Sequence, residues 1–268
     1  MLLGRLNNIC QMFPFIRGFK GPLNKMLKQL HGGGTVRLSV EARSDLLCWG
    51  NFLSGKSQWH PIARRHDSPP LACRVFTSDA AGWVKDSRDD GKLGCGNLGL
   101  DVDGSICLAM QTFWPQPVTE LVALGDNLGC KTTSLEFLGI LLPFVLFPEL
   151  MANQYVVVRV DNIGCYFGWV NRQSAGDNLA SMLIRCLHLI CSYLACQVHI
   201  EHLPRKSNWE ACLVDRLSRE RMTWESDRKL VESFGMPRSA KALSDWMMKP
   251  VVDWDLPMKL LKHVCKNS

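Results

Sequence analysis

The order of apolar and polar positions divides the chain into a helical start, a central region that combines strands and helices, and a tail. Residues 1–30 place apolar side chains at helical spacing, and Pro14 and Pro22 interrupt this pattern, which predicts two short basic helices. A longer helix is predicted at 38–54, with Ser39 as its N-terminal cap, because a serine hydroxyl accepts a hydrogen bond from the first turn.

A two-residue period, typical of strands, begins at residue 74. The segments 74–79, 94–102 and 105–114 follow one another across a polar loop and a turn, which predicts three antiparallel strands. The β-branched run at 155–161 predicts a buried parallel strand, and 197–202 predicts a fifth strand.

Helices are predicted between these strands. Residues 134–150 are apolar nearly all round, with Glu136 near the start, and this pattern is typical of a buried helix. Further helices are predicted at 163–170, after a cap near Asp177, and at 209–221. The predicted fold class is therefore α/β, with a mixed sheet of five strands, three antiparallel and two parallel, flanked by helices.

Three parts follow from this order. Residues 1–66 form a helical segment, residues 73–222 form the α/β domain, and residues 223–268 form a tail of short helices. The boundary after the first part is the polar stretch 55–72, which ends in prolines.

Composition and charge favour a globular protein with an anionic partner. With 268 residues, 47% of them hydrophobic, the chain is long enough for one substantial domain plus appendages, and its composition excludes a disordered chain or a fibre. The net charge of +6 is unevenly spread, because residues 1–66 contain ten Lys and Arg against Glu41 and Asp45. A polyanion bound at this basic end is one interpretation, and a merely soluble basic helix pair is the other.

The sequence gives no sign of a membrane segment. The most apolar run, 137–147, is shorter than the roughly 20 residues that span a bilayer, and Pro143 breaks it. Arg5 is the one basic residue in the first ten, ahead of a discontinuous apolar pattern that does not fit a signal peptide. We therefore expect an intracellular protein, cytoplasmic or nuclear, with no membrane partner.

The 12 cysteines include no Cys-x-x-Cys pair, and most lie in apolar runs. They are interpreted as small buried hydrophobes in a reducing compartment, with no disulfide partner. Cys196, His199 and His202 have a spacing that suggests a metal, but on the predicted strand they alternate between faces or lie far apart. A zinc site is therefore not favoured.

Four acids occupy unusual settings. Asp79 and Asp161 each end a predicted strand, where a carboxylate is presented at the mouth of the sheet, while Glu136 and Asp215 lie on helices. For Glu136 alone, helix capping is the alternative explanation. Convergence of all four would cost several kcal/mol through repulsion at about 4 Å, and bound cations or raised pKa values would be needed to offset it.

Such an oxygen-only set selects Mg²⁺ or Mn²⁺ rather than zinc. Two such ions, roughly 4 Å apart, activate a water and stabilise a leaving 3′ oxygen. Phosphodiester hydrolysis is therefore the leading reaction class.

Four motifs resemble the ribonuclease H domain of a retroelement reverse transcriptase, most closely that of tyrosine-recombinase retrotransposons of the DIRS and Ngaro type. They are Thr77-Ser-Asp-Ala-Ala-Gly82, Ser134-Leu-Glu-Phe137, Val160-Asp-Asn162 and the run from His202 to Arg219. In addition, Leu3-Gly-Arg-Leu-Asn7 and the run from Glu41 to Trp49 resemble the thumb or connection region that follows the polymerase palm.

The resemblance implies a ribonuclease H-like fold and hydrolysis of the RNA strand of an RNA–DNA hybrid. It implies two Mg²⁺ ions, or Mn²⁺, with Asp79, Glu136, Asp161 and Asp215 as catalytic metal ligands. The substrate-binding residues it implies are Ser78, Gly82, Asn162, His202, Arg205 and Asn208. For the last three, a solvated basic loop is the alternative interpretation.

Two departures from the family pattern matter. In many relatives the last acid lies four residues after the loop asparagine, where this chain has Cys212; Asp215 is aligned instead through the run Asp215-Arg-Leu-Ser-Arg219. No aromatic-x-Asp-Asp turn is present, so no polymerase activity is expected. The chain looks like the C-terminal remainder of a larger polyprotein, whose polymerase region would be a partner. The alternatives are a non-catalytic nucleic-acid-binding relic and another nuclease of the same fold, such as a DNA exonuclease or a strand transferase.

Overall fold

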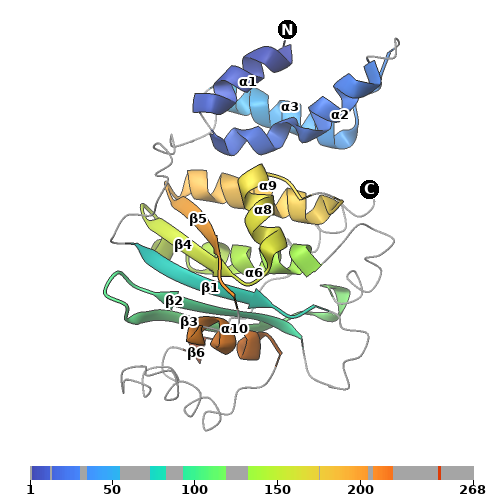
Figure 1. Cartoon of the computed structure of the whole chain (residues 1–268). Helices are drawn as coiled ribbons and strands as arrows, with labels where there is room; N and C mark the ends of the chain where they lie inside the picture. Colours follow the sequence, from blue (N-terminus) through green and yellow to red (C-terminus); the bar gives the residue numbers. More distant parts are fainter. Residues whose placement is uncertain are drawn as a thin grey trace.

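The computed structural model describes residues 2–12, 14–30, 35–54, 73–82, 93–118, 132–174, 176–204, 208–219 and 247–248. Its centre is a β-sheet with helices on both faces, and a separate group of helices lies beyond one of these faces (Figure 1).

The strands are β1 (Arg74–Ala80), β2 (Gly94–Leu100), β3 (Ile106–Phe113), β4 (Tyr155–Val160), β5 (Gln197–His202) and β6 (Met247–Met248). Their order across the sheet is β5-β4-β1-β2-β3-β6. Strands β1, β2 and β3 are antiparallel neighbours, whereas β4 runs parallel to β1 and to β5. These pairings confirm the predicted mixed sheet of three antiparallel and two parallel strands, which is the arrangement predicted for a ribonuclease H-like fold.

Strand β6 adds a sixth position that the sequence did not predict. Met247 and Met248 pair in parallel with Ala109 and Met110 of β3. These two residues lie in the segment 223–268, for which short helices were predicted. They are extended because they complete backbone hydrogen bonds of β3. The other residues of that segment lie outside the described part of the chain.

The helices are α1 (Leu2–Met12), η1 (Pro14–Lys20), α2 (Gly21–Leu30), α3 (Val40–Leu53), α6 (Thr132–Leu146), α7 (Pro148–Met151), α8 (Ile163–Asn171), α9 (Asn178–Tyr193) and α10 (Trp209–Arg219). The helix predicted at 134–150 is divided in two at Phe147, because Pro148 begins α7. The two predicted caps are confirmed: Ser39 accepts a hydrogen bond from the N–H of Ala42, and Asp177 accepts one from the N–H of Ala180.

Each face of the sheet has its own hydrophobic core. On one face, Phe76 and Val158 pack with α6, α8 and α9, including the buried Phe137. On the other face, Leu98 packs with Leu213 of α10 and other apolar residues. Helix α10 and helix α6 lie on opposite sides of the sheet (Figure 1). The alternation of side chains along β1 therefore decides which of its residues meet α6 and which meet α10.

Helices α1, η1, α2 and α3 form a group, here called the N-terminal module, with its own core of seven buried residues. Trp49 lies in that core and donates a hydrogen bond from its indole N–H to the carbonyl of Phe19 at 3.0 Å. The module contacts α9: Arg185 donates to Asp45 at 3.0 Å and to the carbonyl of Gly18 at 3.2 Å. Its two predicted short helices are α1 and α2, but the end of the predicted domain 1–66 lies outside the described residues.

Among the described residues, no helix is both long and apolar enough to cross a membrane. The ten described cysteines are free thiols, and half of them are buried. Their environment agrees with the interpretation that they pack as small hydrophobic residues.

Candidate active site

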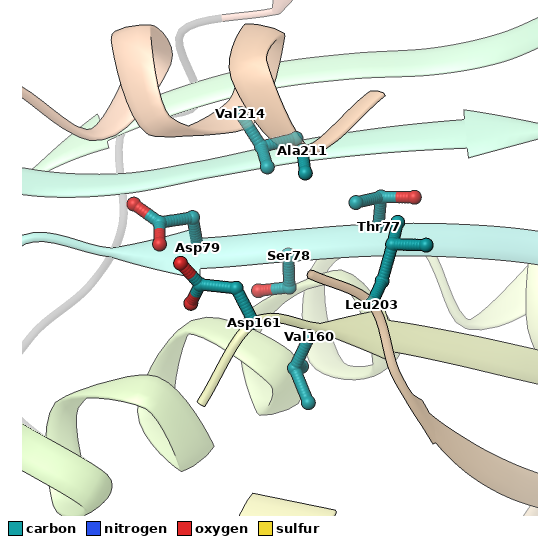
Figure 2. A pocket seen from close by; sticks show the side chains of 8 residues that line it. All are labelled: Thr77, Ser78, Asp79, Val160, Asp161, Leu203, Ala211 and Val214. Carbon is teal, nitrogen blue, oxygen red and sulfur yellow. The ribbon is translucent and has the colours of Figure 1, made fainter. Parts of the chain in front are cut away.

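Three carboxylates meet beside the end of β1. Asp79 lies on β1, Glu136 on α6 and Asp161 directly after β4, and each offers an oxygen within 4.8 Å of the others. Asp79 and Glu136 are buried, with 2% and 4% of their surface exposed, and Asp161 is half-buried. Figure 2 shows the carboxylates of Asp79 and Asp161 side by side. Three acids that are far apart in sequence thus form one group.

The sheet brings two of these acids together. Strands β1 and β4 are parallel neighbours in which Ser78 pairs with Val160, so Asp79 and Asp161 follow at the same level. Parallel strands reach the same edge of a sheet with the same chain direction, and this edge collects functional groups in open α/β sheets.

Helix α6 supplies the third acid from the face of the sheet opposite α10. Gly139 lies where α6 crosses β1 and β2: a Cβ there would lie 3.2 Å from Cys95 Cβ and 3.4 Å from Ser78 Oγ. The backbone N–H of Ala80 donates to Glu136 Oε2 at 3.1 Å. The glycine permits the close approach, and the hydrogen bond fixes the carboxylate beside the end of β1.

Asp79 receives a hydrogen bond from α10. Ser218 Oγ lies 2.6 Å from Asp79 Oδ2, and the Ser218 side chain is fully buried. No role was assigned to Ser218 from the sequence. The signal that could have found it is its position in the Asp-x-Leu-Ser-Arg run.

Asp215, the predicted fourth ligand, does not belong to this group of three acids. It is half-buried, and its Oδ1 accepts a hydrogen bond from Arg219 Nε at 2.7 Å. Helix α10 turns Ala211 and Val214 towards the pocket (Figure 2), and the next residue is rotated by about 100° around the helix. The expected convergence is therefore found for three of the four acids, and the assignment of Asp215 as a ligand stays a prediction.

A pocket opens between Asp79 and Asp161. Its lining residues are Thr77, Ser78, Asp79, Val160, Asp161, Leu203, Ala211 and Val214 (Figure 2). Ser78 Oγ is buried and has no hydrogen-bond partner among the described residues. Figure 2 shows this hydroxyl directed to the side where Asp161 lies. Because buried hydroxyls nearly always have partners, this one is available to hydrogen-bond a group that enters the pocket.

Two of the predicted substrate-binding residues adjoin Asp161. Asn162 caps α8 and accepts a hydrogen bond from the N–H of Gly164 at 2.8 Å. His202 is exposed, and its Nε2 lies 3.0 Å from the carbonyl oxygen of Asp161, so this nitrogen is the donor. Both contacts hold the backbone around Asp161.

The other predicted substrate-binding residues lie at the ends of elements. Gly82 follows β1, and a Cβ there would meet only ordinary contacts, the nearest 3.4 Å from Thr132. Asn208 precedes α10, and its Oδ1 accepts a hydrogen bond from the N–H of Glu210 at 2.7 Å, so its side chain caps this helix. Arg205 lies outside the described residues.

A partly buried ion pair lies beside the pocket and was not predicted from the sequence. Glu210, 5% exposed, accepts a hydrogen bond from Thr77 Oγ1 at 2.6 Å, and Arg159 Nη1 lies 3.2 Å from both of its carboxylate oxygens. This contact ties the first turn of α10 to β1 and β4. The residue types alone gave no signal, because an acid in a first helical turn is common.

Two thiols lie close enough to the acids for the negative charges to affect their pKa values. Burial, followed by the negative charges of Glu136 and Asp79, raises the pKa of the Cys95 thiol. Burial raises the pKa of Cys165 as well, with Glu136, Asp161 and Asp177 contributing. Burial is the largest cause for both thiols, in line with side chains that pack as small hydrophobic residues.

The group of three acids fits a hard divalent cation. Within the described part of the chain it is the one group of at least three His, Cys, Asp or Glu close enough to share an ion, and it offers oxygen atoms only. Oxygen donors favour Mg²⁺, Mn²⁺ or Ca²⁺ over zinc. The spacing of Cys196, His199 and His202 does not produce such a group.

No family model and no curated protein matches this sequence. Among solved structures, the chain is similar to the N-terminal RNase H domain of a Mycobacterium tuberculosis protein, which was solved as a fusion with maltose binding protein. The sequence identity is 14%, the match covers 54% of this chain and 95% of that chain, and the TM-score is 0.39. The chain is also similar to RNase H1 from the halophilic archaeon Halobacterium salinarum, with 14% identity, 54% and 96% coverage, and a TM-score of 0.39.

A third similar structure is an RNase H1 isolated from compost by a metagenomic approach, with 16% identity, 55% and 96% coverage, and a TM-score of 0.35. At these identities and TM-scores the likeness carries no argument about activity.

Proposed function

We propose that this chain hydrolyses the RNA strand of RNA–DNA hybrids, with two divalent ions, Mg²⁺ or Mn²⁺, held by Asp79, Glu136 and Asp161. The observation that carries the proposal is the convergence of these three carboxylates from β1, α6 and the end of β4. The motifs that resemble a ribonuclease H domain surround the same three acids.

When bound, such ions activate a water for attack on phosphorus and stabilise the leaving oxygen. The residues of the chain prepare this site. The Ala80 N–H and the Ser218 hydroxyl orient the carboxylates of Glu136 and Asp79. The burial of both acids strengthens their attraction for a cation, because charges interact more strongly away from water.

Substrate contacts are proposed for Ser78, Gly82, Asn162, His202, Arg205 and Asn208. Ser78 is the best supported of these, because its buried hydroxyl lines the pocket without a partner among the described residues. A hydroxyl can donate to or accept from a group of the hybrid, which proteins recognise through 2′-hydroxyls and backbone shape. His202 is exposed beside the same opening.

A retroelement origin is proposed on the sequence motifs alone. The N-terminal module would then be the remnant of a thumb or connection region, and the polymerase region of a longer protein would be a partner. An intracellular location, cytoplasmic or nuclear, belongs to the same proposal.

Cleavage of a labelled RNA–DNA hybrid in Mg²⁺ tests the function. We expect specific cleavage by the full chain, its loss in EDTA, and its recovery when Mg²⁺ or Mn²⁺ is added. Asp79→Asn and Asp161→Asn should each reduce the rate roughly a hundredfold or more, as expected for removal of a group that stabilises the transition state. Asp103→Asn is the matched control, because Asp103 is an exposed acid in the turn between β2 and β3.

Absence of cleavage, or equal cleavage by Asp79→Asn, would contradict the proposal. Duplex DNA and duplex RNA of the same sequence complete the experiment. Cleavage of DNA alone would identify another nuclease of this fold.

Binding without cleavage is the second candidate function, and the surface of the N-terminal module favours it. Its exposed basic residues are Arg5, Arg17, Lys25, Lys28, Arg37 and Arg43. Asp45 does not offset them at the surface, because it is 1% exposed and paired with Arg185. This candidate predicts salt-sensitive binding of the hybrid that weakens when these side chains are replaced by Ala, with no product formed.

A further inference from the structure

We infer that Ser218, and not Asp215, is the residue of α10 that serves the three-carboxylate site, as a positioning residue that holds Asp79 for a divalent ion. This inference rests on the metal site of the proposed function. It is specific to this chain, because it assigns the α10 position to a hydroxyl where a fourth acid was predicted.

The contact between Ser218 and Asp79 is short and buried from solvent. Ser218 Oγ lies 2.6 Å from Asp79 Oδ2, and both residues are buried, at 0% and 2% exposure. A hydroxyl that donates to a carboxylate makes a charge-assisted hydrogen bond, which is stronger than a neutral one. A carboxylate has about four acceptor positions, so this bond leaves acceptor positions of Asp79 for a cation.

The position of Ser218 is fixed from the sheet. A Cβ on Gly96 of β2 would lie 2.4 Å from Leu217 Cβ and 2.5 Å from the Val214 carbonyl, so α10 lies directly on the backbone of β2. The buried Gln111 of β3 donates from Nε2 to the carbonyl of Leu217 at 2.8 Å. These contacts set the rotation of the last turns of α10 and direct Ser218 at Asp79.

The first turn of α10 is fixed as well. Glu210 accepts from Thr77 Oγ1 at 2.6 Å, two residues before Asp79 on the same strand. The helix is thus held to β1 at both ends, and it cannot rotate Asp215 towards the acids without breaking buried contacts. Asp215 instead accepts from Arg219 one turn further along, at 2.7 Å.

Ser218 also has a second acceptor. Its Oγ lies 2.8 Å from the backbone carbonyl of Asp215. A serine hydroxyl carries one proton, which it can direct to only one acceptor at a time. The charged carboxylate of Asp79 is the stronger acceptor, so the proton is directed to Asp79 rather than to the nearby Asp215 carbonyl. An ionised carboxylate at this position could not hold Asp79 in this way, since it accepts hydrogen bonds and donates none.

Direct measurement of Mn²⁺ binding by electron paramagnetic resonance tests this inference without relying on catalysis. The proteins are the full chain, Ser218→Ala and Asp215→Asn. Because removal of a group that orients a metal ligand typically costs about tenfold or more in affinity, we expect Ser218→Ala to weaken Mn²⁺ binding roughly tenfold. Asp215→Asn should stay within about twofold of the unchanged protein, because its carboxylate lies outside the group.

Two further variants separate positioning from folding. Ser218→Thr keeps the hydroxyl and should recover most of the affinity that Ser218→Ala loses. Ser218→Asp places a carboxylate beside Asp79; we expect it to lower the melting temperature without metal and to increase the stabilisation by Mn²⁺. Circular dichroism at the binding temperature establishes that each variant is folded.

A larger loss of affinity in Asp215→Asn than in Ser218→Ala would overturn the inference, as would an unchanged affinity in Ser218→Ala or no Mn²⁺ binding by the unchanged chain. Failure of the proposed function has a different signature. In that case Mn²⁺ binds and depends on Ser218, while no hybrid is cleaved.

Discussion

The backbone N–H of Ala80 donates a hydrogen bond to Glu136 Oε2 at 3.1 Å, so the acid of α6 is tied to the residue that follows Asp79. Both partners are buried. The contact couples two opposing effects. The hydrogen bond stabilises the position of Glu136, while the neighbouring carboxylates of Asp79 and Asp161 repel it in the absence of a cation.

Substitution of Glu136 separates these effects. Glu136→Gln keeps an oxygen acceptor for the Ala80 N–H and removes the charge, which relieves a repulsion of roughly 3 kcal/mol per pair of charges at an effective dielectric constant of about 20. Glu136→Ala leaves the buried N–H without this acceptor, which costs about 1–3 kcal/mol. In EDTA, differential scanning calorimetry should therefore give Glu136→Gln a higher melting temperature than the unchanged protein. Glu136→Ala should melt at a lower temperature than Glu136→Gln. The opposite order of the two variants would show that the hydrogen bond does not hold the acid.

Gly96 is predicted to be essential for the packing of α10 against β2. In Gly96→Ala the new methyl group would meet Leu217 Cβ at 2.4 Å and the Val214 carbonyl at 2.5 Å, and the helix must move. Overpacking of this kind typically costs about 1–3 kcal/mol, and here we expect at least the upper value because one of the contacts is backbone. Urea denaturation measures the loss.

Gly50→Ala is its matched control. Gly50 lies inside α3, where a Cβ meets nothing within 4 Å. Alanine should therefore stabilise the protein by about 0.5–1 kcal/mol through its better helix propensity. Equal effects at the two positions would mean that α10 is not packed as described.

The ion pair of Arg185 and Asp45 is expected to hold the N-terminal module on α9. Asp45 is 1% exposed, so Arg185→Met removes a charged partner from a buried carboxylate, which typically costs about 3–5 kcal/mol. The double variant Arg185→Met/Asp45→Leu should recover much of this loss, because no buried charge remains. Arg43→Met on the exposed face of α3 is the control. Limited proteolysis with mass spectrometry would show whether the module is released, and equal stability of the single and double variants would contradict the pair's role.

Asp101 is expected to contribute to stability only above acidic pH. The hydrogen bond from Arg74, followed by that from the Val102 N–H, lowers the pKa of Asp101. A carboxyl whose pKa is lower in the folded state stabilises the protein above its unfolded pKa of about 3.9, and this contribution is lost as the pH falls through the folded pKa.

Asp101→Asn should therefore lower the melting temperature at pH 7, and the difference from the unchanged protein should shrink below about pH 4. The effect is small, because the Asp101 side chain is 36% exposed. A difference that widens on acidification would rule out this coupling.

The strands and the buried helices could be predicted from the local pattern of apolar and polar residues. Strand β5 has the predicted bounds, and β1 and β4 differ from prediction by one residue at one end. Asp79 and Asp161 were recognisable because each ends an apolar strand, and Glu136 because an acid in an apolar helix is costly to bury. The division of the 134–150 helix was missed because Pro148 supports a helix start as readily as a helix end.

The rotation of α10 about its axis could not be predicted from the pattern of apolar and polar residues. Periodicity identifies the apolar face of a helix, but Asp215 and Ser218 lie within one turn of each other on the same side. Gly96 and Gln111, on strands more than 100 residues earlier, decide which of the two meets Asp79. Two residues of β6 are likewise too few to show a period, and their conformation depends on β3.

Strand β6 also has a consequence for self-association. Met247 and Met248 pair with Ala109 and Met110, in the middle of the outermost strand of the antiparallel meander. An uncovered sheet edge exposes a row of backbone donors and acceptors that can template the addition of another chain. A protein truncated before Met247 would expose this edge of β3 to other chains. Oligomers or aggregates of such a fragment would then result from the loss of the pairing that Met247 and Met248 provide.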